Sequence, residues 1–293
     1  NISYFGRGDE AHMVYQFALP PLLLHGLLRG SAAILRRWAS ALGSPPAGCS
    51  YLNFTASHDG IGVRPLEGLV QADEIDWLVD EVRKRGGKVN ERSMPDGSHR
   101  PYELNITYRD ALSEAGDEEL GLRRFICSQA VVLALQGVPA VYFHSLVGET
   151  NWEAGPTREG GENRDINRRR WEWEDLNTRL DDPEGAHAWI HRVYVALLRL
   201  RSQCPAFHPD APQEVLETDD KAFAIVRTSL DGRVKVVCCF NFTAESIKLP
   251  GDHLEMQLTG AKSFRNILDG TVVEVAGGQW QLQPYECAWV IAE

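Results

Sequence analysis

The segment 51–63 constrains this chain most, because an extended apolar run stops there at a histidine, a carboxylate and a glycine. Alternating large apolar side chains predict a buried strand over residues 51–57, and Gly60 allows a sharp exit from it. His58 and Asp59 would then stand at the carboxyl end of the strand, which is the end that carries the chemistry in α/β barrels. An Asp-Gly pair also marks ordinary turns with a solvated aspartate, so the pattern by itself leaves both interpretations open.

Four separated segments carry motifs whose order and spacing extend over nearly the whole chain. They are residues 9–25, residues 57–64, which begin with Ser-His-Asp, residues 137–142 and residues 163–168. Together they resemble the alpha-amylase superfamily of glycoside hydrolases, and within it the sucrose phosphorylase branch. A fifth segment, residues 101–108, is more similar to glucosylglycerate phosphorylases than to sucrose phosphorylases.

This resemblance implies a reaction. A retaining α-glucoside phosphorylase transfers a glucosyl unit to inorganic phosphate and gives α-glucose 1-phosphate, here from glucosylglycerate. The expected partners are a small-molecule glucoside and phosphate, with phosphate as co-substrate and no further cofactor. Three alternatives stay open: an α-glucosidase or transglucosidase, a sucrose or sucrose 6-phosphate phosphorylase, and a noncatalytic carbohydrate-binding protein.

The resemblance also implies roles for the Ser-His-Asp motif. Asp59 would bind hydroxyls of the glucosyl unit and stabilise the transition state, while His58 would hydrogen-bond a sugar hydroxyl. Retaining chemistry needs two further carboxyl groups about 5 to 5.5 Å apart. The resemblance places that nucleophilic aspartate and acid/base glutamate in a preceding segment. We therefore expect residues 1–293 to be the carboxyl-terminal portion of a longer enzyme, inactive alone and completed by the missing amino-terminal half of its barrel.

Two irregular stretches supply the remaining candidates for ligand binding. By resemblance, Tyr102 and Arg164 fall where sucrose phosphorylases contact phosphate. Arg100 stands where those enzymes look acidic, so we expect it to recognise an anionic acceptor such as glycerate; this departure disfavours sucrose as the substrate. Glu103 could accept a hydrogen bond from an acceptor hydroxyl or cap a turn. Each side chain also has an ordinary alternative, as a solvated or loop-anchoring residue.

Apolar periodicity and turn residues predict the order of elements in the first two thirds of the chain. Strands are expected over residues 12–17, 51–57 and 140–144. Helices are expected over residues 19–28, 32–42, 74–85, 118–135 and 190–201. Residues 90–102 and 148–170 are expected to form long loops over the carboxyl ends of the strands.

Composition changes near residue 210. Short β-rich runs at residues 222–228, 234–242 and 287–291 alternate with Asp-Gly, Pro-Gly and Gly-Gly turns, which predicts a small antiparallel sheet. A whole (β/α)8 barrel takes about 250 residues, whereas the first 209 offer three βα units. The expected fold class is therefore α/β: a partial (β/α)8 (TIM) barrel, its last three βα units, in residues 1–209, followed by a small all-β domain in residues 210–293.

Charge and cysteine content exclude other classes of function. The formal charge is −11 and the basic residues are scattered, which argues against nucleic-acid binding. The six cysteines show no metal or disulfide spacing, so we expect reduced thiols, a cytoplasmic protein and no metal site. Cys238 and Cys239 should point to opposite faces of one strand. No apolar run reaches the length of about 18 residues that spans a bilayer.

Overall fold

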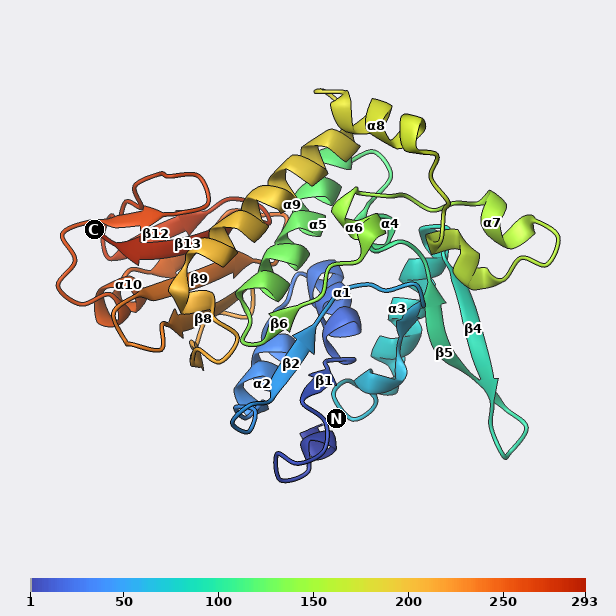
Figure 1. The fold of residues 1–293 in the computed structure, drawn as a ribbon, viewed down its shortest axis with the longest axis horizontal. Helices are drawn as coiled ribbons and strands as arrows, with labels where there is room; N and C mark the ends of the chain where they lie inside the picture. The colour runs from blue at the N-terminus through green and yellow to red at the C-terminus, as the bar shows by residue number, and fades with distance from the viewer. Residues whose placement is uncertain (1) are drawn as a thin grey trace.

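The computed structural model describes residues 2–293, whose strands form a short parallel sheet, a protruding hairpin and an antiparallel sheet (Figure 1). The α-helices are α1 (Leu19–Arg29), α2 (Ala33–Ala41), α3 (Ala72–Lys84), α4 (Tyr108–Leu112), α5 (Glu118–Ala134), α6 (Phe143–Leu146), α7 (Ala154–Thr157), α8 (Trp173–Asp181), α9 (Ala186–Gln203) and α10 (Asp252–Gln257). Single 3₁₀ turns lie at η1 (Ile2–Phe5), η2 (Arg64–Leu66), η3 (Asn163–Asn167) and η4 (Pro205–Phe207). None of the helices in residues 2–293 has the length and apolar character of a membrane-spanning segment.

The parallel sheet has the order β1-β2-β6, with β1 (Met13–Tyr15), β2 (Ser50–Asn53) and β6 (Val138–Pro139). The prediction of a strand over residues 140–144 is wrong. Pairing with β2 ends at Pro139, and the amide of Leu146 donates to the carbonyl of Tyr142, so the chain closes into the helical turn α6. The strand expected over residues 51–57 is also shorter, because the chain leaves the sheet after Asn53.

A hairpin replaces the loop that the sequence predicted over residues 90–102. Strand β4 (Lys88–Ser93) pairs with β5 (His99–Asn105), and β5 also pairs with the short β3 (Ile61–Gly62). Pro101 favoured the loop prediction, yet it lies where β5 has β4 on one side and no β3 partner on the other, so the strand tolerates its missing N–H. Gly97 supplies the left-handed turn at the tip with φ of 82°.

The antiparallel sheet has the order β11-β13-β9-β8-β7. Its strands are β7 (Gln213–Val215), β8 (Ala222–Thr228), β9 (Lys235–Asn241), β11 (Phe264–Asn266) and β13 (Cys287–Ala292), and β10 (Ile247–Pro250) pairs separately with β12 (Gln279–Leu282). The three predicted β-rich runs are therefore confirmed as strands. Cys238 and Cys239 do point to opposite faces, because they belong to two different hydrophobic clusters.

One hydrophobic cluster continues across residue 210. It joins Leu23 of α1 and Phe125 of α5 to Phe240 of β9 and Trp289 of β13. In Figure 1, α5 and α9 run side by side between the two sheets. The boundary near residue 210 stays a prediction, because the two expected domains share this core.

Hydrogen bonds from residues beyond position 210 hold the turn between α5 and β6. Arg227 of β8 is fully buried and donates to the carbonyl of Ala134 at 2.6 Å. Gln213 of β7 accepts from the amide of Gln136 at 2.8 Å. Gly137 has φ of 120°, and a Cβ there would lie 2.6 Å from the carbonyl oxygen of Tyr51. The register of β6 against β2 thus depends on the carboxyl-terminal strands.

Candidate active site at the end of β2

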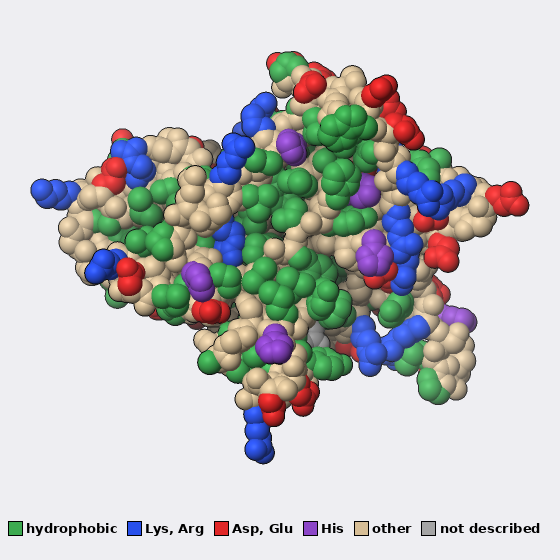
Figure 2. Space-filling view, viewed as in Figure 1, with side chains coloured by type: hydrophobic (Ala, Val, Ile, Leu, Met, Phe, Trp, Pro, Cys, Tyr) green, Lys and Arg blue, Asp and Glu red, His purple; other side chains and the backbone are tan. Residues whose placement is uncertain are grey.

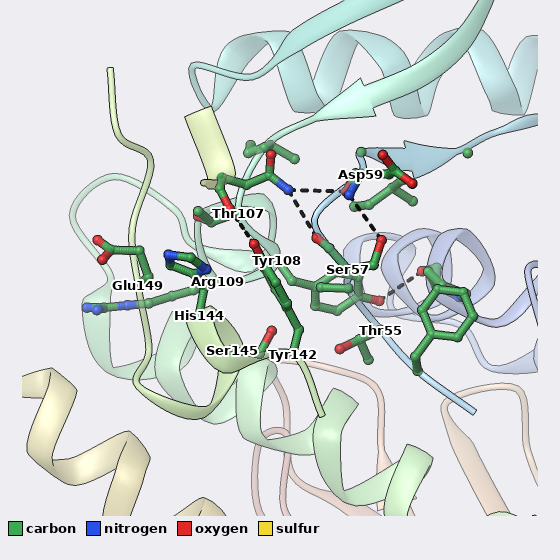
Figure 3. Close-up of a pocket in the computed structure, with 18 of the residues that line it drawn as sticks. Thr55, Ser57, Asp59, Thr107, Tyr108, Arg109, Tyr142, His144, Ser145 and Glu149 are labelled. Carbon is green, nitrogen blue, oxygen red and sulfur yellow. Dashed lines mark hydrogen bonds between the residues drawn. The ribbon is translucent and has the colours of Figure 1, made fainter. Parts of the chain in front are cut away.

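The segment that follows β2 turns sharply to present Asp59. The Ser57 hydroxyl accepts a hydrogen bond from the Asp59 amide at 3.1 Å. The side-chain amide of Asn167 in η3 donates to the carbonyls of Ser57 and Asp59 at 3.2 and 3.1 Å. These contacts fix the backbone that carries Asp59, as Figure 3 shows.

Two arginines from the η3 region converge on the Asp59 carboxylate. Arg164 Nη1 lies 3.0 Å and Arg168 Nη2 3.4 Å from Asp59 Oδ1. The His58 ring lies beside the same oxygen at 3.6 Å, and Arg168 Nε donates to the His58 carbonyl at 2.6 Å. The structure therefore brings together Asp59, His58 and Arg164, all predicted from the sequence, with Arg168 beside them.

Glu103 lies behind Arg164 and is not open to a ligand. Its side chain is buried, and its two oxygens accept from Arg164 Nε and Nη2, both at 3.0 Å. This hydrogen-bonded pair is the main reason that the pKa of the Arg164 guanidinium is raised. A bidentate contact of this kind fixes the plane of the guanidinium and leaves its third nitrogen facing Asp59.

Tyr102 and Arg100 lie on the same hairpin but take different places. Tyr102 is exposed, and its carbonyl accepts from the amide of Val63 at 3.1 Å next to the Asp59 segment. Arg100 stands opposite Arg92 on β4 and lines a separate groove with Glu67. The structure does not bring Arg100 to the Asp59 pocket, and its role stays a prediction.

A cavity of about 70 Å³ lies beneath Asp59, between the exit of β2, the start of α4 and α6. Figure 3 shows Asp59 and Glu149 on opposite sides of it, with Thr55, Tyr142 and Ser145 between them. The sequence analysis did not single out Tyr142 and Glu149. Tyr142 belongs to a motif, but Glu149 is a buried carboxylate in a stretch that reads as a polar loop, and no local pattern marks it.

The charged side chains around this site are of both signs, because Arg164 and Arg168 lie against Asp59 and Glu103. Figure 2 shows Lys and Arg side chains gathered on the side that carries the hairpin and η3, next to apolar side chains in the centre of the face. Arg158 is not among the arginines that face Asp59, because it pairs with Asp165 at 2.9 Å. Within residues 2–293, no three or more His, Cys, Asp and Glu side chains are arranged to hold a metal ion.

Several curated relatives are similar over most of this chain. It is 45% identical to a glucosylglycerate phosphorylase of Spirochaeta thermophila over 82% of its length, and 41% identical to one of Allomeiothermus silvanus over 99%. A sucrose phosphorylase of Agrobacterium vitis is 31% identical over 76% of the chain. The matches cover 41%, 49% and 43% of these three relatives, so the chain spans about half the length of the curated relatives it matches.

Solved structures show the same fold at lower identity. A sucrose 6F-phosphate phosphorylase from Thermoanaerobacter thermosaccharolyticum superposes with a TM-score of 0.66 at 20% identity, covering 82% of this chain and 45% of that one. The structure of AmyP in complex with maltose superposes with a TM-score of 0.63 at 13% identity, covering 98% of this chain and 51% of that one. No family model matched the chain. From the sequence similarity to the phosphorylases and the shared fold, the chain belongs to the sucrose phosphorylase branch of the alpha-amylase superfamily.

Proposed function

We propose that this chain carries the glucosyl-binding side of a retaining α-glucoside phosphorylase that acts on glucosylglycerate. The observation that carries the proposal is the Asp59 carboxylate, held at the carboxyl end of β2 between Arg164 and Arg168. The names of the relatives at 36% to 45% identity support the substrate and the use of phosphate. The co-substrate is inorganic phosphate, and the scheme uses no further cofactor.

The proposal extends to the fold. We take β1, β2 and β6 with their helices as the last three βα units of a (β/α)8 barrel, and residues 210–293 as its small β-domain. The nucleophile and the acid/base would lie in the other half of the barrel, outside residues 1–293, in keeping with the resemblance and with a chain that spans about half the length of the relatives it matches. Residues 1–293 alone would then not catalyse the reaction.

The proposed roles of the side chains are those that the family resemblance implies, and the position of Asp59 beside His58 supports them. Asp59 binds sugar hydroxyls and favours the cation-like transition state, because its negative charge lies next to the developing positive charge. His58, whose side chain is largely exposed, hydrogen-bonds a sugar hydroxyl from the same side. Both groups act by binding the transition state more tightly than the substrate.

Phosphate must intercept the glucosyl intermediate in place of water, so the site needs fixed cationic donors. Arg164 is the donor that is already oriented, and the exposed hydroxyl of Tyr102 is a second candidate. Arg100, on the same hairpin as Tyr102, would bind the carboxylate of glycerate. Glu103 acts in this scheme by holding Arg164.

Incubation of the full-length protein with glucosylglycerate, with and without inorganic phosphate, tests the proposal. We expect α-glucose 1-phosphate and glycerate to form only when phosphate is present. Release of free glucose at the same rate in both samples would show an α-glucosidase. Preference for sucrose or sucrose 6-phosphate would change the acceptor, and binding without turnover would show a carbohydrate-binding protein.

A further inference from the structure

We propose that Asn90, which touches neither Asp59 nor its cavity, is a positioning residue for Arg164. Asn90 lies on β4 and pairs directly with Glu103 across the hairpin. Its effect passes through Glu103 to the guanidinium that faces Asp59. The inference rests on the proposed function for its kinetic consequence, but its structural content can be measured without turnover.

The inference rests on a ring of hydrogen bonds that is closed by the peptide bond between Asn163 and Arg164. Asn163 Nδ2 donates to Asn90 Oδ1 at 2.7 Å, and Asn90 Nδ2 donates to Glu103 Oε2 at 3.0 Å. Glu103 in turn accepts from Arg164. Asn163 and Arg164 are consecutive residues of η3, so the hairpin grips two adjacent residues at once. Since one end of the Asn90 amide accepts and the other donates, the ring also fixes its orientation.

The backbone of β4 is shaped for this contact. The register of the hairpin shifts between Asn90 and Glu91, which marks a β-bulge. Bulges redirect side chains and occur often beside active sites. Here the bulge follows directly after the residue that contacts Glu103 and η3.

The segment that carries Asp59 also packs against the Glu103 side chain. A Cβ at Gly60 would lie 2.6 Å from Glu103 Cγ. Glu103 is therefore confined between Gly60, Asn90 and Arg164, and little space is left for it to adjust. Loss of the Asn90 contact should change the angle at which Arg164 meets Asp59.

Asn90→Asp is the informative change, because it keeps the shape of the side chain and replaces its donor with an acceptor. It would place a second carboxylate against Glu103 Oε2, 3.0 Å from it in the present arrangement. In the full-length protein we expect kcat/KM to fall by about tenfold, mostly through a higher KM for phosphate. Asn90→Ala should cost less, since it removes the donor without adding a charge. Ser93→Ala, an exposed position on the same strand, is the matched control.

A double-mutant cycle separates positioning from general damage. If Asn90 acts through Arg164, Asn90→Asp should lower kcat/KM less than about twofold in an Arg164→Ala background. A tenfold loss in both backgrounds, or wild-type kinetics in Asn90→Asp, would overturn the proposal. Thermal unfolding of each variant checks that the fold is kept.

Nuclear magnetic resonance of arginine Nε–H groups gives a readout that does not depend on activity. The Arg164 signal, assigned by its loss in Arg164→Ala, should shift or broaden in Asn90→Asp and stay unchanged in Ser93→Ala. An unchanged signal in Asn90→Asp would refute the ring even if the wild type shows no phosphorolysis. Absence of phosphorolysis together with a shifted signal would remove the proposed function and keep the structural inference.

Discussion

Asp59 is the residue on which the proposed chemistry depends most. Its carboxylate lies next to the cationic side chains of Arg164 and Arg168. Asp59→Asn removes the negative charge and keeps the size of the side chain. We expect kcat/KM of the full-length protein to fall by about a hundredfold or more, as for the loss of one strong electrostatic stabiliser. Steady-state kinetics of phosphorolysis measures this loss. Near-normal turnover with an intact fold would remove Asp59 from the catalytic group.

Substitutions of Arg164 and of Arg100 should affect the use of different substrates. Arg164→Ala should raise KM for phosphate, because an oriented guanidinium is lost, and Arg100→Ala should mainly weaken use of a carboxylate-bearing acceptor. Arg164 lies against Asp59, whereas Arg100 lines a separate groove with Glu67, which favours independent effects. Synthesis from α-glucose 1-phosphate with glycerate and with glycerol as acceptors measures the difference. Equal losses for phosphate and for both acceptors would indicate disorder of the hairpin instead.

At this scale the sequence predicted the neighbourhood of Asp59 better than the state of Glu103. The family resemblance carried by two motifs placed His58, Asp59 and Arg164 in one site, and the structure brings these three side chains together. The sequence predicts that Glu103 accepts a hydrogen bond from a hydroxyl of the acceptor substrate or caps a turn, whereas the structure shows it as a buried partner of Arg164. Residues 103–105 are all buried, so the burial of Glu103 does not follow from the two-residue alternation of a strand, and no local pattern marks it.

Helices α1 and α3 are joined by a charged contact that should respond to acid. Glu74 accepts from His25 Nε2 at 2.7 Å and from Arg29 Nε at 2.9 Å, and its pKa is lowered chiefly by the His25 contact. A lowered folded pKa stabilises the protein above the unfolded pKa, and this contribution is lost as pH falls through the folded value. Glu74→Gln should therefore lower the free energy of unfolding by about 1 kcal/mol at pH 7.

The difference between wild type and Glu74→Gln should shrink as pH falls below the ordinary glutamate pKa of about 4.3, because the unfolded chain then takes up a proton before the folded carboxyl does. Urea unfolding at pH 7 and at pH 3.5 to 4 measures both free energies. A difference that stays constant over this range would show that the contact does not depend on the Glu74 charge.

Gly60 is needed because two elements meet there without room for a side chain. A Cβ would lie 2.6 Å from the carbonyl oxygen of Leu104, a backbone atom of β5 that cannot move aside. Gly60→Ala should lower the free energy of unfolding by about 1 to 3 kcal/mol, as for overpacking, and should also impair activity. Gly62→Ala is the matched control, since its nearest atom would be Pro65 Cδ at 3.9 Å. Equal thermal unfolding midpoints for the two variants would contradict this account.

The elements show where local sequence signals were enough. Helices α1 and α5 were predicted closely, because their apolar residues and end signals agree. Hairpin β4 and β5 was missed, because its register is set by pairing between strands and by contact with η3, neither of which a local pattern contains. The strand expected over residues 140–144 was wrong, because the pairing with β2 lies earlier, at β6, and the chain then forms α6.

For the whole molecule, the shared core predicts that both expected domains unfold together. Arg227 is the sharpest probe, since it donates to the carbonyls of Ala134, His208 and Ala211 and is fully buried. Arg227→Met should leave those carbonyls without this donor and lower the free energy of unfolding by about 3 kcal/mol. Urea unfolding followed by near- and far-ultraviolet circular dichroism should give coincident transitions. Two separated transitions in the wild type would show that the core is not shared.

Local patterns also could not show how the two parts join. A change in composition near residue 210 predicted a boundary, and the strands after it were found. The contacts of Arg227 and Gln213 with the turn before β6 join segments about 80 to 90 residues apart in sequence, as the pairs Gln136–Gln213 and Ala134–Arg227 show. A charged residue fully buried inside a strand gives no sign in the sequence of which carbonyls it will satisfy.

The hydrogen bonds from Arg227 and Gln213 to the turn between α5 and β6 have a consequence for recombining this chain with its relatives. A crossover near residue 210 would exchange Arg227 and Gln213 while leaving the carbonyls and the amide that they contact in the host. Chimeras are more promising if the turn and the strands that hold it are inherited from one parent. Shuffled libraries should accordingly show linked inheritance of residues 134–137 with residues 213 and 227, although more than 70 residues separate the closest of them.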